Sequence, residues 1–145
     1  MTKLADAFTD LFMTASCVLP YDFTGDGFVD LFIGGRAFPY EYGRIPRSYL
    51  LENDKAGRFK DVTTQYAPGL LQPGLVTQGK WVDIDKDGDQ DLLLTLEWNG
   101  IAAFMNDKGK FTPNGSPKRK VGGISSCLLI LTAMVTWIWW PVTWD

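Results

Sequence analysis

The chain has 145 residues, of which 46% are hydrophobic, and 17 acidic against 14 basic side chains give a formal net charge of −3. A chain of this length can bury one modest core. It has no basic stripe that would neutralise phosphates, which argues against nucleic acid as a partner. It contains no histidine, and two cysteines, Cys17 and Cys127, cannot form a disulfide framework.

Residues 1–14 are a lead-in without the basic segment and apolar core of a signal peptide. After them, β-branched and aromatic runs are separated by breaks rich in Gly, Asn and Asp, which predicts an all-β fold. The expected strands fall in two sets of four, near 15–22, 30–34, 48–53 and 58–63, and near 76–83, 91–96, 101–106 and 110–112. Four strands are the content of one propeller blade, so we expect one blade over 15–70 and a second over 71–117.

Two acidic loops of the same design each precede an apolar run. Loop 1 is Asp22-Phe23-Thr24-Gly25-Asp26-Gly27-Phe28-Val29-Asp30, and loop 2, which starts 61 residues later, is Asp83-Ile84-Asp85-Lys86-Asp87-Gly88-Asp89-Gln90-Asp91. Carboxylates packed this closely repel one another unless a cation lies among them, and oxygen donors suit a hard ion such as calcium. We therefore expect a calcium site at the start of each following strand.

The predicted ligands are the side-chain oxygens of positions 1, 3, 5 and 9 and the backbone carbonyl of position 7. In loop 1 these are Asp22, Thr24, Asp26, Asp30 and the carbonyl of Phe28, and in loop 2 they are Asp83, Asp85, Asp87, Asp91 and the carbonyl of Asp89. Thr24 is a neutral ligand, so weaker binding is expected in loop 1. The glycines at position 6 permit a turn that a Cβ would strain.

An EF-hand is rejected because its position 12 requires a bidentate Glu, where this chain has Ile33 and Leu94. The remaining alternative is an acidic turn without an ion, since Asp and Gly are common in turns. Two copies in register favour the metal. The ion is expected to be structural, because neither loop is accompanied by an evident nucleophile or base; no catalytic residue is predicted.

A second element also repeats in the same order. The segment from Leu50 to Phe59 is echoed by the segment from Ala103 to Phe111, and each has the form of a hairpin turn that begins at Asn53 or Asn106. Two elements that recur together indicate a repeat architecture. Between the blade elements of the first repeat, the long loop 35–47 with its aromatic residues is either a recognition loop or a packing surface for a neighbouring domain.

Residues 118–145 differ from the rest, since four of the six tryptophans lie in the last nine residues and 128–144 carry no charge. One interpretation is a membrane anchor at the short end of the spanning range. The other is a frameshifted third repeat. If the possible codons of the tail are read in a shifted frame, in which each new codon starts at the third base of the old one, they permit the sequence Asp-Phe-Asp-Gly-Asp-Gly-Asp-Met-Asp. Met and Trp have single codons, and these codons force the Gly at position 6 and the Asp at position 9 of this sequence.

The segments 22–36, 48–63 and 81–111 resemble the FG-GAP and VCBS repeats of integrin-α-type β-propellers, and most closely bacterial propellers that carry an ASPIC/UnbV-type domain. The resemblance implies a seven-bladed, extracellular, periplasmic or cell-surface propeller that binds calcium and a protein or carbohydrate ligand without catalysis. Thr24 departs from the usual Asp or Asn. Two blades cannot close a propeller, so the chain is expected to be a piece of a larger protein. The alternatives are a non-catalytic fragment of a secreted enzyme and a short membrane-anchored calcium-binding protein.

Overall fold

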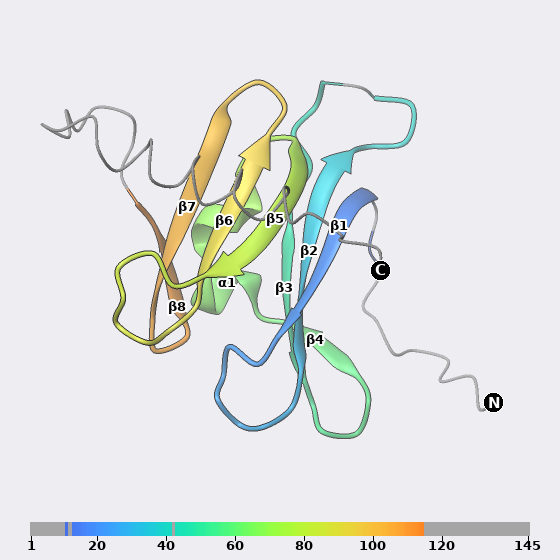
Figure 1. The fold of residues 1–145 in the computed structure, drawn as a ribbon. Coiled ribbons are helices and arrows are strands. Elements are labelled where there is room, and N and C mark those ends of the chain that lie inside the picture. The colour runs from blue at the N-terminus through green and yellow to red at the C-terminus, as the bar shows by residue number, and fades with distance from the viewer. Residues whose placement is uncertain (1–10, 12, 42, 115–145) are drawn as a thin grey trace, which may run out of the picture. The chain divides into compact units, whose positions relative to one another are not determined.

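The computed structural model describes residues 11, 13–41 and 43–114, which form two antiparallel four-stranded sheets (Figure 1). In each sheet the strands lie in chain order. Sheet 1 contains β1 (Thr14–Tyr21), β2 (Asp30–Ala37), β3 (Tyr49–Asn53) and β4 (Phe59–Asp61), and sheet 2 contains β5 (Val76–Val82), β6 (Asp91–Leu96), β7 (Gly100–Asp107) and β8 (Lys110–Pro113). The eight strands expected from the sequence are confirmed.

Two short helices connect β4 of sheet 1 to β5 of sheet 2, and the sequence did not predict them. Helix α1 (Thr63–Tyr66) and the 3₁₀ turn η1 (Pro68–Leu71) follow β4, which ends at Asp61. The Asp61 carboxylate accepts hydrogen bonds from the backbone N–H of Thr63 at 3.0 Å and from its hydroxyl at 2.6 Å, and so turns the chain out of the strand. Pro68 starts the second turn, where a missing N–H costs nothing.

The sequence repeat extends to the details of strand pairing. The hairpin β1–β2 closes at the pair Tyr21 and Asp30, and β5–β6 closes at Val82 and Asp91. Each hairpin also has a register shift at its far end, between Ala15 and Cys17 in sheet 1 and between Val76 and Gln78 in sheet 2. Both shifts obey the same 61-residue offset as the two acidic loops, so the repeat unit is a folded hairpin and not the loop alone.

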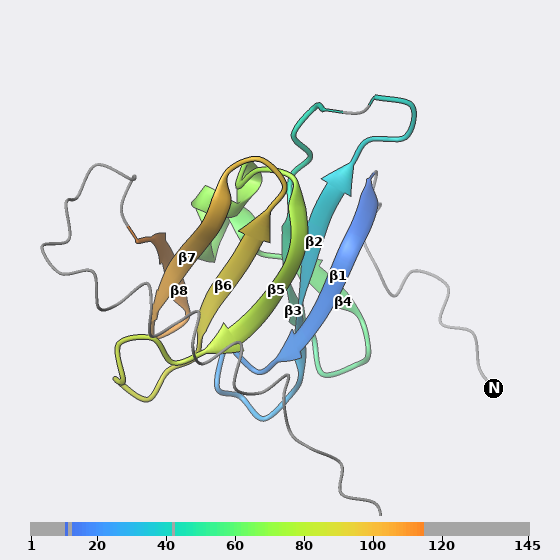
Figure 2. The same cartoon turned by 45° about the horizontal axis from the view of Figure 1, so that its top comes forward.

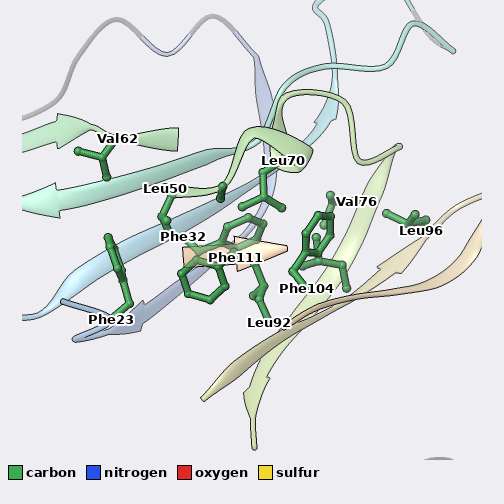
Figure 3. Packing of buried hydrophobic residues seen from close by; sticks show 12 residues of the cluster. Phe23, Phe32, Leu50, Val62, Leu70, Val76, Leu92, Leu96, Phe104 and Phe111 are labelled. Atoms are coloured by element: carbon green, nitrogen blue, oxygen red, sulfur yellow. The ribbon is translucent and has the colours of Figure 1, made fainter. Parts of the chain in front are cut away.

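The main core lies between the two sheets (Figure 3). It is built from aromatic and aliphatic side chains of both sheets and of the helical connection, among them Phe32, Leu50, Leu70, Leu92 and Phe111. Since neighbouring residues of a strand point to opposite faces, the alternation of the apolar side chains in β2 and β3 decides which of them reach this core. Burial on this scale supplies the main driving force for folding.

Strands β1 and β5 contact each other and run side by side (Figure 2). Gly79 lies at this contact, where a Cβ would be 2.9 Å from a terminal methyl group of Leu19 and 2.7 Å from one of Leu94, so both side chains would have to move. The indole N–H of Trp81 donates to the carbonyl of Leu19 at 3.4 Å across the same contact.

The predicted tail 118–145, with its frameshift and membrane-anchor interpretations, and nearly all of the lead-in 1–14 lie outside the described residues. Among the residues that the structure does describe, neither helix has the length and hydrophobicity needed to span a bilayer.

Candidate metal centre

The two acidic loops share one backbone conformation. Positions 4 and 6 have positive φ in both, at 73° and 87° for Gly25 and Gly27, and at 64° and 101° for Lys86 and Gly88. The carboxylate of the first Asp accepts the N–H groups of these two positions. In loop 1 the distances from Asp22 are 2.7 and 2.8 Å. The first Asp therefore folds each loop around its own carboxylate.

In loop 2 the corresponding hydrogen bonds to Asp83 measure 2.6 Å from Lys86 and 3.2 Å from Gly88. Lys86 adopts the left-handed conformation that Gly25 adopts in loop 1, which is uncommon for a residue with a Cβ. Loop 2 thus adopts the same turn as loop 1, although its position 4 is a lysine and not a glycine.

The last Asp of each loop is held by the neighbouring hairpin. Asp30 and Asp91 are fully buried, and each accepts the backbone N–H of an asparagine, Asn53 or Asn106, at 2.8 Å. The amide groups of these asparagines donate in return to the carbonyl of position 8, Val29 or Gln90, at 3.1 Å. We call this pair of contacts the Asp–Asn clasp.

The sequence indicates only that Asn53 and Asn106 lie in hairpin turns, and it does not predict their hydrogen bonds to the acidic loops. The available signal was that hairpin and loop recur together in the same order. What the sequence could not show is that β3 and β7 bring the two elements into contact through their pairing with β2 and β6.

Loop 2 gathers three of its predicted ligands. One carboxylate oxygen from each of Asp83, Asp85 and Asp91 lies within 4.8 Å of the others. Within the described part of the chain, this is the one cluster of at least three potential metal ligands. Partial desolvation, together with the negative charges of Asp87 and Asp91, raises the pKa of Asp85 above its ordinary value.

The charges of neighbouring carboxylates thus add to the effect of desolvation on the pKa of Asp85, although Asp83 and Asp91 each accept backbone N–H groups. Asp87 and Asp89 are not part of the converging trio; Asp87 accepts the N–H of Asp89 at 2.9 Å, and Asp89 accepts the N–H of Lys108 at 3.3 Å. An all-oxygen donor set with excess negative charge fits a hard divalent cation. That Asp87 and the carbonyl of Asp89 also bind the ion remains a prediction.

Loop 1 has a different arrangement. The hydroxyl of Thr24 donates to Asp22 and lies equally close to Asp30, at 3.3 Å from an oxygen of each. Asp26 accepts the N–H of Phe28 at 2.9 Å and forms an ion pair with Lys55 at 3.1 Å. The N–H of Phe28, and then Lys55, lower the pKa of Asp26.

Positions 1, 3 and 9 therefore meet in loop 1 as they do in loop 2, but a hydroxyl takes the place of one carboxylate, and the protein itself supplies a positive charge beside Asp26. The predicted ligands Asp22, Thr24, Asp26, Phe28 and Asp30 fit a divalent ion less well than the loop 2 set. The role of Phe28 rests on its backbone carbonyl, and its side chain is exposed at the surface.

The model of one protein family, described as FG-GAP-like repeat, matches residues 22–94. No curated protein matches the chain, and no solved structure does. None of these comparisons shows the expected likeness to propellers with an ASPIC/UnbV-type domain. The matched segment begins at the first residue of loop 1, ends inside β6 and covers half of the 145 residues. With its two sheets, its two equivalent acidic loops and this match, the chain belongs to the FG-GAP repeat family.

Proposed function

We propose that the chain is a calcium-binding module of a β-propeller, in which each four-stranded sheet is one blade. Its role is to bind a protein or carbohydrate ligand, as in adhesion, as part of a larger extracellular, periplasmic or cell-surface protein. Membership of the FG-GAP repeat family supports this proposal, because such repeats are typical of propeller-type modules in extracellular proteins. We propose no catalytic activity for the chain.

The observation that carries the calcium proposal is the convergence of Asp83, Asp85 and Asp91. Asp91 is the first residue of β6, and the other two precede it in the connection from β5. These three residues would hold the ion, and its charge would offset the repulsion that raises the pKa of Asp85. Bound there, the ion would fasten the β5–β6 connection to the sheet.

The proposal that each sheet is a propeller blade is supported by sheet 1. Phe32 and Leu50 face the core between the sheets, whereas Ile33, Tyr49 and Leu51 belong to a second buried apolar cluster. A sheet with two apolar faces needs cover on both sides, as blades inside a propeller have. Two blades cannot form a closed ring, so further blades would be supplied by the rest of the larger protein.

Calcium titration of the chelator-treated protein by isothermal calorimetry tests the metal site. We compare the wild type with Asp85→Asn, which keeps the shape of the side chain and removes one ligand charge. Asp107→Asn is the control, because it makes the same chemical change at an exposed residue at the end of β7, outside the trio. We expect calcium to bind the wild type and the control, and Asp85→Asn to weaken binding by about tenfold or more.

Thermal unfolding provides a second measurement. Calcium at about 100 times its dissociation constant should stabilise the fold by about 2.7 kcal/mol, which corresponds to a rise in Tm of roughly 10 °C for a domain of this size. A chelator should reverse the rise. Equal calcium affinity of the Asp85→Asn and Asp107→Asn variants, or no calcium-dependent change in either assay, would refute the proposed site.

A further inference from the structure

Loop 1 contains a positive charge of its own. The Lys55 ammonium, from the turn between β3 and β4, lies 3.1 Å from a carboxylate oxygen of Asp26 and 5.5 Å from the centre of the Phe28 ring. Asp26 and Phe28 are positions 5 and 7 of the loop, both of them predicted ligand positions. The lysine therefore neutralises one predicted ligand of loop 1, the Asp26 carboxylate, and contacts the ring of Phe28 rather than its carbonyl.

The six carboxylate oxygens of loop 1 all have a donor. Asp22 accepts three N–H groups of its own loop, Asp26 accepts one N–H and the lysine, and Asp30 accepts Asn53 and the N–H of Thr24. The hydroxyl of Thr24 lies 3.3 Å from both Asp22 and Asp30 and so adds a hydrogen between two carboxylates. Hydrogen bonds and a cation thus reduce the repulsion within this loop without a metal.

Loop 2 has the same backbone N–H donors to its first and last Asp, but it lacks the hydroxyl and the ion pair. It has Asp85 where loop 1 has Thr24, and Asp89 where loop 1 has Phe28. Lys108 occupies the hairpin position of Lys55, yet it contributes its backbone N–H to Asp89, and no ion pair between it and loop 2 occurs among the described residues. Loop 2 has five carboxylates, whereas loop 1 has three together with the ammonium of Lys55.

We propose that Lys55, together with the hydroxyl of Thr24, takes the place of calcium in loop 1, so that loop 1 folds without a metal and loop 2 is the calcium site of this pair. The assignment of calcium to loop 2 rests on the proposed function, whereas the role of Lys55 and Thr24 rests on the contacts of loop 1. The lysine is a permanent part of the chain, so loop 1 keeps its shape when calcium is scarce. The two loops would then respond differently to the same ion.

Amide signals of the two position-6 glycines distinguish the loops in a ¹H–¹⁵N NMR titration. The N–H of Gly27 donates to Asp22, and the N–H of Gly88 donates to Asp83, so each signal reports on one loop. We titrate calcium into the chelator-treated full chain. In the wild type the Gly88 signal should shift to saturation, and the Gly27 signal should keep its chelator position.

The double variant Thr24→Asp with Lys55→Gln restores a ligand charge and removes the lysine charge. We expect its Gly27 signal to acquire a saturable calcium shift that the wild type lacks. Lys108→Gln is the matched control in the other hairpin and should leave Gly27 unresponsive. Unchanged signals of the strand residues in all variants verify that the fold is retained.

The two hypotheses fail separately in this experiment. A saturable shift of Gly27 in the wild type overturns the role of Lys55 and Thr24, and so does an unresponsive Gly27 in the folded double variant. A wild-type Gly88 signal that does not respond to calcium refutes the proposed function instead. In that case the response of Gly27 in the double variant still decides the inference about loop 1.

Discussion

The Asp–Asn clasp occurs twice with the same hydrogen bonds but with different exposure to water, which permits a matched comparison. Asn106 is 4% exposed, and its side chain accepts the N–H of Gly109 at 2.8 Å and donates to the carbonyl of Gln90 at 3.1 Å. Asn53 accepts the N–H of Lys55 at 3.0 Å and donates to Val29 at 3.1 Å, and both of these bonds are open to solvent.

Asn106→Ala removes both side-chain bonds and leaves the N–H of Gly109 buried without a partner. A buried group left unsatisfied costs about 1–3 kcal/mol, and the second, partly buried bond adds about 1 kcal/mol. We therefore expect a loss of about 2–4 kcal/mol in the free energy of unfolding. Asn53→Ala removes the same two bonds where water can replace them, so its cost should be about 1 kcal/mol or less.

Urea unfolding of the wild type and both variants, followed by tryptophan fluorescence, measures these differences. All three proteins should be compared in calcium and in chelator, because bound metal adds to stability through the same loop. A cost for Asn53→Ala that equals or exceeds that of Asn106→Ala would show that burial does not set the strength of the clasp. The two variants form a matched pair, since both make the same substitution at the same repeat position.

Two further predictions concern stability. Gly35→Ala should cost about 1–3 kcal/mol in urea unfolding, because the new Cβ would lie 2.4 Å from the backbone carbonyl oxygen of Arg47, which cannot rotate away; an unchanged midpoint would refute this close approach. The N–H groups of Arg58 and Ala56 lower the pKa of Asp54, so its carboxylate stabilises the fold above its unfolded pKa of 3.8, and this stabilisation is lost as the pH falls through the lower folded-state pKa. Asp54→Ala should therefore destabilise the protein at neutral pH, and its difference from the wild type should shrink in strong acid; an equal difference at both pH values in chemical unfolding would contradict this sign.

Local patterns in the sequence were enough to predict the strands and the loops. Apolar runs between breaks of Gly, Asn and Asp gave all eight strands near their observed positions. The spacing of carboxylates and glycines gave the two turns, because the positive φ angles at position 6 follow from the chemistry of the residues within each loop. The short helical segment 63–71 was missed, since its turn depends on a contact between Asp61 and Thr63 that has no strong sequence signature.

The ten predicted ligands illustrate the limit of this reasoning. The repeat pattern indicates two nearly equal loops that differ at Thr24. Among the described residues, positions 1, 3 and 9 meet in both loops, as three carboxylates in loop 2 and as Asp22, Asp30 and the Thr24 hydroxyl in loop 1. Lys55 is 25 residues beyond the end of loop 1, and no spacing rule connects the two. Its ion pair with Asp26 exists because β3 pairs with β2 and places the β3–β4 turn beside the loop.

The sequence by itself determined the repeat, the all-β class and the candidate chelating loops, because these depend on the order of residues within short segments. Only the tertiary structure decided which carboxylates meet, which asparagines hold them and which loop has a lysine beside it. Those contacts join segments that are distant in the chain and are created by strand pairing. The charge balance of each loop is therefore a property of the folded sheet, and it is this balance that separates two loops of almost the same sequence.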